Sequence, residues 1–279
     1  MKRRQRTPAA PTFRTILARQ AQSLGVPTDA LERALILGQV AGLLVEHPKF
    51  RRVIAFKGGA VMRLIDRSPR LSRDLDSAEL RGHPIQRRWV REALSTRKAK
   101  RAVLGVSDIV RQSPKSLGFL VRCRSISGGT DMPITLTVNW EEPIELEPEW
   151  QSFNLPGGDP IRIPVLHRVE RAAEKVRAFL DRGEANDAYD LYWYSTRVLD
   201  ANDWKRLPGV LRAKLRVLLH AVGDELHKRF ETMRSNAATQ WQIGQGIVVV
   251  ENPPNWDAVN RQLSAFKKLV PQKRPKPTS

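Results

Sequence analysis

The chain has 279 residues, of which 48 are lysine or arginine and 29 are aspartate or glutamate, so its formal net charge is +19. This length can bury one large or two small hydrophobic cores. So large a positive excess favours a polyanionic partner, usually nucleic acid, over charge that serves solubility alone.

Cys123 is the only cysteine, which excludes an intrachain disulfide and a cysteine-based zinc site. The basic start of the chain is not followed by an apolar run of signal-peptide length. No stretch approaches the roughly 20 apolar residues that cross a bilayer. We therefore expect a cytoplasmic protein with no membrane partner and no disulfide partner.

The first part of the chain is predicted to be a basic arm followed by helices. Residues 1–10 have the composition of a flexible basic arm. Apolar residues then recur at helical spacing, which predicts one helix around residues 13–24 and another from Asp29 to His47, before Pro48.

The next stretch combines a glycine turn with two acidic residues. A strand ending at Phe56 leads into Gly58-Gly59 and a short helix, and a second strand carries Asp74 and Asp76 on one face. Glycine lets main-chain N–H groups approach phosphate oxygens, and two carboxylates suit magnesium or manganese. A plain turn and a solvated Asp-x-Asp are the ordinary alternatives for each half alone.

A helix after Pro84 is unusually basic. We read its cationic side chains either as a surface for the nucleic-acid backbone or as a solvated helix face. This basic cluster comprises Arg87, Arg88, Arg91, Arg97, Lys98 and Lys100.

Strand-like runs then extend the predicted sheet. They cover residues 102–110, 117–126 and 134–140, which gives an α/β core over residues 11–145. The prolines and glycines of residues 146–164 predict a connector. A helical C-terminal subdomain over residues 165–265 and a basic disordered tail over residues 266–279 complete the chain.

The predicted helical subdomain carries further polar candidates. Lys175 lies off the apolar stripe of its helix and is free to point toward a cleft. Gly183 ends that helix, and the next presents Asp187 and Asp190 on one face at i, i+3 spacing.

These features occur as an ordered set of motifs: Lys57-Gly58-Gly59, then Arg70-x-Ser72-x-Asp74-x-Asp76, then Lys175-x-Arg177-Ala178 and Asp187-x-x-Asp190. Over about residues 53–194 the set resembles the AbiEii-type nucleotidyltransferases, toxins of bacterial abortive-infection and type IV toxin–antitoxin systems. The resemblance implies an α/β fold: a small mixed-sheet nucleotidyltransferase core related to DNA polymerase β, followed by a mainly helical C-terminal region.

The resemblance also implies an activity. It is the transfer of a nucleotide from an NTP to RNA, with tRNA as the acceptor in some members, which blocks translation until a cognate antitoxin neutralises the toxin. Asp74 and Asp76 would bind Mg²⁺ or Mn²⁺. The implied catalytic residues are Asp74, Asp76, Lys175 and Asp187. The residues implied in NTP and phosphate binding are Lys57, Gly58, Gly59, Ser72, Lys175 and Asp190.

Two of these residues have more than one expected role. Asp187 is expected to orient Lys175 or the nucleotide, whereas Asp190 has a structural alternative, pairing with Arg177 or Arg182. In related toxins a serine at the place of Ser72 is phosphorylated by a kinase antitoxin. A phosphate with about −1.5 to −2 charges beside two carboxylates would repel the NTP.

The chain departs from the family pattern at three positions. Ala60 follows the glycines where a hydroxyl residue is usual, and Asn186 replaces an arginine. Thr137 stands where a third acidic residue is often found, and a weaker site is expected unless Glu141 or Glu142 substitutes for it.

Two other functions remain open at this point. Transfer to a small-molecule acceptor would use the same fold, although a small acceptor needs no extended basic surface. A catalytically silent RNA-binding protein is the second alternative, and the three departures keep it open.

Overall fold

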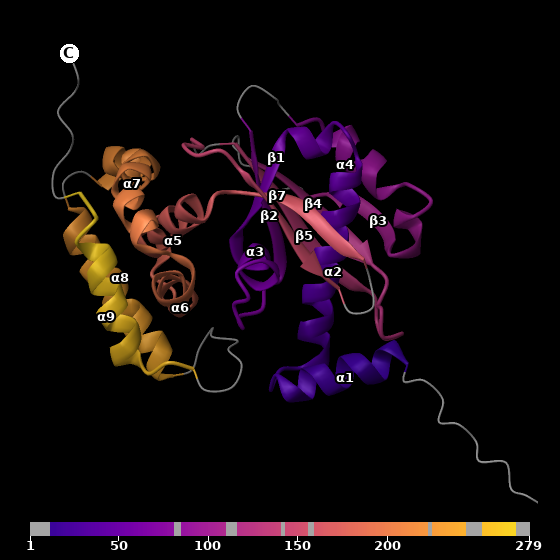
Figure 1. The fold of residues 1–279 in the computed structure, drawn as a ribbon, viewed down its shortest axis with the longest axis horizontal. Coiled ribbons are helices and arrows are strands. Elements are labelled where there is room, and N and C mark those ends of the chain that lie inside the picture. Colours follow the sequence, from indigo (N-terminus) through magenta and orange to yellow (C-terminus); the bar gives the residue numbers. More distant parts are fainter. Residues whose placement is uncertain are drawn as a thin grey trace, which may run out of the picture.

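The computed structural model describes residues 12–80, 85–109, 116–140, 143–155, 159–222, 225–243 and 253–271. A sheet with its helices is followed along the chain by a helical region (Figure 1). The strands are β1 (Ile54–Lys57), β2 (Asp74–Glu79), β3 (Val103–Asp108), β4 (Ser116–Cys123), β5 (Met132–Asn139), β6 (Glu149–Asn154) and β7 (Pro160–Val165).

The α-helices are α1 (Phe13–Ser23), α2 (Thr28–Glu46), α3 (Gly58–Leu64), α4 (Arg87–Leu94), α5 (Arg168–Arg182), α6 (Ala185–Trp193), α7 (Ala201–Val222), α8 (Leu226–Gln242) and α9 (Trp256–Lys267). Short helical turns are η1 (Phe50–Arg52), η2 (Ala99–Arg101) and η3 (Tyr194–Val198). Within the described ranges, none of these helices is both long and apolar enough to cross a membrane. The predicted arm at residues 1–10 and the tail segment 272–279 lie outside the described residues.

The sheet has the strand order β3-β4-β5-β2-β1-β7-β6. Strand β1 pairs antiparallel with β2 and parallel with β7, and β2 pairs parallel with β5. The sheet is therefore mixed, which confirms the predicted α/β class with a helical C-terminal region.

Alternation along the strands explains how the sheet divides its two faces. In β5, Ile134, Leu136 and Val138 are buried in one core cluster, while Thr135 and Thr137 between them are only partly buried. The same core includes Leu37 and Leu44 of α2. Helix α2 thus covers the apolar face, and the opposite face carries polar side chains.

The predicted connector at residues 146–164 is instead a hairpin of the sheet. Strands β6 and β7 pair antiparallel, and Phe56 of β1 is in register with Val165 of β7. Ile163 and Val165 are buried in the core under α2. Pro160 is the first residue of β7, where a proline is tolerated although it cannot donate a hydrogen bond to the neighbouring strand. The proline content of this segment therefore did not indicate a connector.

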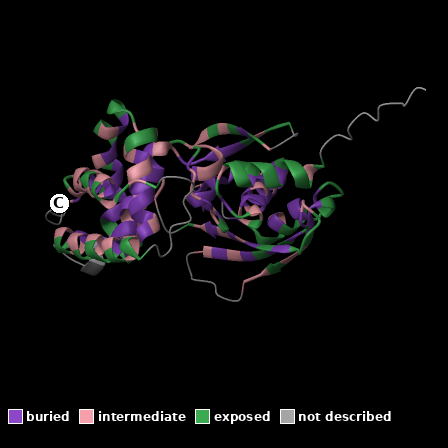
Figure 2. Cartoon of the chain, turned by 90° about the horizontal axis from the view of Figure 1, so that it is seen from below, coloured by how far each residue is buried: buried purple, intermediate pink, exposed green. Residues whose placement is uncertain are grey.

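The helical region packs around a second core. The apolar stripe predicted for α5 is buried, and Gly183 ends the helix in the left-handed conformation with φ of 61°. Figure 2 shows buried residues concentrated both in these helices and in the sheet. Helix α9 ends at Lys267, so regular structure extends into the predicted tail.

A buried ion pair joins the helical region to the core. The Arg171 Nη2 atom of α5 lies 2.6 Å from Asp66 Oδ1, in the loop after α3, and both side chains are almost fully buried. The Tyr194 hydroxyl donates to Asp66 Oδ2 at 3.2 Å, and Trp193 Nε1 donates to the backbone carbonyl oxygen of Asp66 at 3.0 Å. Burial raises the pKa of Asp66 despite the opposing charge of Arg171.

We expect Arg171→Met to lower the free energy of unfolding at pH 7 by about 3–5 kcal/mol, because it leaves the buried Asp66 carboxylate without its counter-ion. Urea unfolding followed by circular dichroism measures this loss. The control is Glu46→Gln, which removes an exposed ion pair with Lys98 and should cost less than about 1 kcal/mol. Equal losses in the two variants would contradict the assigned role of Arg171.

Candidate active site

The turn between β1 and α3 is shaped by close contacts that only glycine permits. Gly58 has a φ of +76°, and a Cβ there would lie 2.4 Å from Asp76 Oδ2. A Cβ on Gly59 would lie 2.7 Å from Arg70 Nη2 and 2.9 Å from Ser72 Oγ. The two glycines therefore make room for the acidic and basic side chains of the following segment.

The two predicted carboxylates share one face of β2. Leu75 between them is buried in the core under α2, so Asp74 and Asp76 face the opposite side. Asp76 is in register with Lys57 of β1, and Asp74 at the strand end is exposed. Burial raises the pKa of Asp76, and the charges of Lys57 and Lys175 oppose that rise.

Strand β5 supplies the neighbours of these carboxylates. Thr135 is in register with Asp74 and Thr137 with Asp76, so threonine occupies the place expected for a third acidic residue. Among the residues that the structure describes, no group of three or more His, Cys, Asp or Glu side chains gathers as a metal site. Glu141 and Glu142, the predicted substitutes, lie outside the described residues.

A buried carboxylate on α6 brings two cations to this site. Asp190 has no exposed side-chain surface and accepts from Arg70 Nε at 2.6 Å and Arg70 Nη2 at 3.0 Å. Lys175 Nζ of α5 lies 2.6 Å from Asp190 Oδ2, with 12% of its side chain exposed. Burial alone would raise the pKa of Asp190, but the charges of Arg70 and Lys175 outweigh it and lower the pKa.

These contacts correct the expected partners of the two α6 carboxylates. Asp187 is paired with Arg182, at 2.7 and 2.8 Å, and does not orient Lys175. Asp190 holds Lys175 and also pairs with Arg70, which was not among its expected partners. With the two acids three residues apart on one helix, spacing could not decide which of them meets Lys175.

Two further side chains belong to the site and were not predicted. Arg70 is part of the Arg-x-Ser-x-Asp-x-Asp motif, so its place in the motif was an available signal. Glu174 of α5 lies 3.1 Å from Lys57 Nζ through its Oε1 atom, and both side chains are nearly buried. No spacing rule connects residues 117 positions apart, so only the fold reveals this pair.

Comparison with known proteins shows the family to which this chain belongs. The family model for the nucleotidyl transferase AbiEii toxin of type IV toxin–antitoxin systems matches residues 42–261. The chain belongs to this AbiEii family. No curated protein matches the sequence.

Solved structures share the AbiEii-family fold of this chain. MenT4, a nucleotidyltransferase toxin from Mycobacterium tuberculosis H37Rv, is 21% identical with a TM-score of 0.63, covering 92% of this chain and 90% of that one. A putative nucleotidyltransferase from H. pylori is 14% identical, with a TM-score of 0.54 and coverage of 88% and 95%. JHP933 from Helicobacter pylori is 15% identical, with a TM-score of 0.53 and coverage of 86% and 91%.

Ser72 lies just before the strand that carries the candidate carboxylates and borders a small cavity. Its Oγ donates to the Asp74 carbonyl oxygen at 3.1 Å. A cavity of about 350 Å³ is bordered by Ser72 together with Arg33, Arg73 and Asp29. The hydroxyl is thus held at the start of β2, next to cationic side chains.

The basic cluster lies away from this candidate active site. Val90 and Leu94 of α4 are buried in the same core as Leu75, on the face of the sheet opposite to Asp74 and Asp76. Arg87 and Arg91 are neutralised in part by Asp108, at 3.5 and 2.9 Å. The structure does not bring these predicted RNA-binding residues together with the carboxylates.

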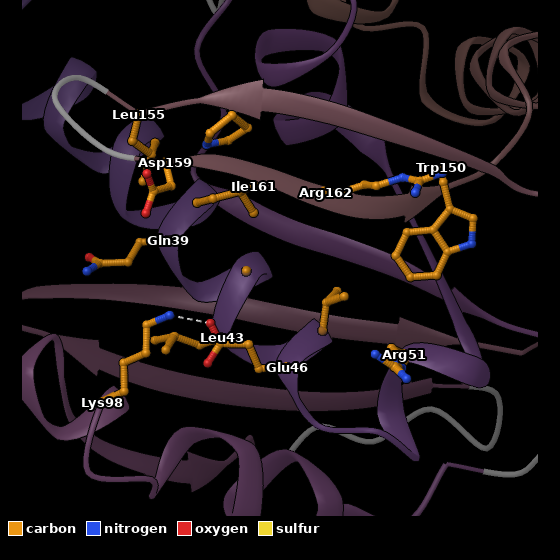
Figure 3. Close-up of a pocket in the computed structure, with 13 residues that line it drawn as sticks. Gln39, Leu43, Glu46, Arg51, Lys98, Trp150, Leu155, Asp159, Ile161 and Arg162 are labelled. Atoms are coloured by element: carbon orange, nitrogen blue, oxygen red, sulfur yellow. Dashed lines mark hydrogen bonds and ion pairs between the residues drawn. The ribbon is translucent and has the colours of Figure 1, made fainter.

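A separate pocket of about 560 Å³ lies between α2 and the β6–β7 hairpin (Figure 3). Trp150 at its rim is 44% exposed, and the Arg162 guanidinium lies 5.5 Å from the centre of its ring. None of the candidate catalytic, metal-binding or NTP-binding residues lines this pocket, although Lys98 of the basic cluster does, so the pocket is distinct from the candidate active site.

We expect Gly58→Ala to destabilise the protein by about 1–3 kcal/mol more than Gly128→Ala does. Both glycines have positive φ, but only Gly58 lies against another side chain; an added Cβ at Gly128 meets nothing within 4 Å. Thermal and urea unfolding of the two variants measure both losses of stability. Their difference separates the effect of the contact with Asp76 from the effect of backbone strain. Equal destabilisation would show that this contact is not required.

The pH dependence of stability should report the Asp190 clamp. Because its pKa is lowered in the folded state, ionised Asp190 stabilises the fold above about pH 4, and this contribution is lost as the pH falls through the folded value. Asp190→Asn should therefore lose less stability than wild type as the pH falls from about 5 to about 3. Urea unfolding at several pH values measures the slope, and Asp181→Asn, exposed on α5, should retain the wild-type slope.

Proposed function

We propose that this AbiEii-family protein is a toxin that transfers a nucleotide from an NTP to RNA, with tRNA as the acceptor. The observation that carries the proposal is the convergence of three elements: the glycine turn, the Asp74–Asp76 pair and the Arg70–Asp190–Lys175 clamp. Acidic ligands and paired cations around a glycine turn suit a triphosphate with its divalent cation.

Asp74 and Asp76 are the proposed ligands of Mg²⁺ or Mn²⁺. Their oxygen atoms fit hard divalent cations, and magnesium is commonly held by only one or two carboxylates together with substrate phosphates. Because Gly58 has no Cβ, the Asp76 carboxylate can lie against the turn where those phosphates would bind. When bound, the metal supplies a Lewis acid that stabilises charge on the transferring phosphoryl group.

The remaining side chains have proposed roles in holding the NTP. Gly58 and Gly59 offer main-chain N–H groups to phosphate oxygens, and Arg70 and Lys175 balance the charge of the departing pyrophosphate. The acceptor hydroxyl oxygen bonds to the α-phosphorus as the bond to the pyrophosphate oxygen breaks. Asp187 supports the site indirectly, because it ties the first turn of α6 to Arg182 at the end of α5.

The nature of the acceptor is inferred from charge. The formal charge of +19 favours a polyanion over a small molecule. The basic cluster would contact RNA that extends beyond the site, around the sheet edge, because phosphate contacts need no fixed spacing. The proposed action on RNA would take place in the cytoplasm.

Control of the toxin is proposed to involve a cognate antitoxin, in line with the type IV system of its family. Ser72 is the proposed phosphorylation site. A phosphate there would add negative charge beside Asp74 and would find Arg33 and Arg73 at the adjacent cavity. Such a modification would oppose binding of the NTP.

A second candidate function, RNA binding without transfer, is favoured by Thr137 in the place of a third carboxylate. The assay that separates the two incubates the protein with each labelled NTP, Mg²⁺ and total tRNA. We expect label on RNA with wild type and at least about a hundredfold less with Asp74→Ala or Lys175→Ala.

Asp181→Ala, which removes an exposed carboxylate of the same helix as Lys175, is the control and should label RNA at the wild-type rate. RNA binding without label would support the silent alternative. Label on a small acceptor in place of RNA would overturn the proposed substrate.

A further inference from the structure

A line of buried charges runs from the candidate site into the helical region. Lys57 Nζ lies 3.1 Å from Glu174 Oε1, and Lys214 Nζ of α7 lies 3.2 Å from the same oxygen. Lys214 also lies 2.8 Å from Glu170 Oε1, and neither of these two side chains has exposed surface. Two lysines and two glutamates thus alternate along the line, beginning beside Asp76.

The inner half of this line is stabilised without Glu174. Lys214 donates to the Pro143 carbonyl oxygen at 2.7 Å in addition to its pair with Glu170. Glu170 in turn accepts from the N–H groups of Glu145 and Leu146, at 3.0 and 2.9 Å. Lys214 therefore keeps a counter-ion and an acceptor if the charge of Glu174 is removed.

At the outer end, Asp76 and Glu174 both lie close to Lys57 in the described part of the chain. Lys57 is in register with Asp76 across β1 and β2, and its side chain meets Glu174 on α5. A lysine ammonium that paired tightly with Asp76 would occupy the carboxylate oxygens that a divalent cation needs. The partner of Lys57 thus affects whether Asp76 can bind a metal.

We propose that Glu174 is a positioning residue that holds Lys57 away from the metal-binding oxygens of Asp76. Lys57 is then a fixed part of the wall of the site, in keeping with its 8% exposure, and not a ligand of the triphosphate. This inference rests on the proposed function of Asp74 and Asp76 as metal ligands.

Direct binding of Mn²⁺ tests the proposal without measuring transfer. Free Mn²⁺ is followed by electron paramagnetic resonance during titration of wild type, Glu174→Gln and the double variant Lys57→Met/Glu174→Gln. We expect Glu174→Gln to weaken Mn²⁺ binding about tenfold, because Lys57 moves to Asp76. The double variant, which lacks the competing ammonium, should recover to within about threefold of wild type.

Three controls make the outcomes separable. Asp76→Asn should abolish the specific Mn²⁺ site, Asp181→Asn should leave it intact, and circular dichroism should confirm that each variant is folded. Unchanged binding in Glu174→Gln, or no recovery in the double variant, would overturn the role of Glu174 alone. A wild type whose Mn²⁺ binding does not depend on Asp76 would overturn the proposed metal site and this inference with it.

A second measurement covers a Glu174→Gln variant that fails to fold. Binding of a non-hydrolysable NTP with Mg²⁺ is compared in Lys57→Met and Lys175→Met. If Lys57 is part of the wall, its loss changes the NTP dissociation constant by less than about threefold, while loss of Lys175 weakens binding at least about tenfold. Equal weakening in the two variants would make Lys57 a triphosphate ligand and overturn the proposal.

Discussion

The pairing of one buried carboxylate with two cations organises this molecule. Asp190 belongs to α6, Lys175 to α5 and Arg70 to the loop before β2, so a single group joins three segments. A carboxylate without exposed surface cannot be hydrated and is stable as an ion only when it is fully paired. The position of the helical region and the supply of cations to the site therefore depend on the same contact.

The wider boundary between the core and the helices has the same ionic character. Hydrophobic side chains form one cluster around the sheet and another among α5–α9, and buried ion pairs lie between them, such as Asp66–Arg171 and Lys57–Glu174. Such pairs require definite geometry, whereas apolar contact tolerates sliding. We infer that this boundary fixes the orientation of Lys175 toward the carboxylates.

Local patterns predicted the parts of the site that lie within one segment. Alternation along β2 was enough to place Asp74 and Asp76 on one face, and the apolar stripe of α5 left Lys175 outside it, because strand and helix periods act over a few residues. The hairpin at residues 149–165 was missed because prolines at strand starts and edges look like a connector in sequence. The basic cluster was recognised as a surface, but periodicity does not tell which face of a sheet a helix covers.

The residue pattern was enough to predict the mixed α/β class and the order of the motifs, and it named the carboxylates and glycines that we propose for the site. Only the tertiary structure decided which charges meet: Asp190 with Lys175 and Arg70, Asp187 with Arg182, and Glu174 with Lys57. The physical reason is that an ionic side chain pairs with any opposite charge that the fold brings within about 4 Å. Residues more than a hundred positions apart carry no local signal of that approach.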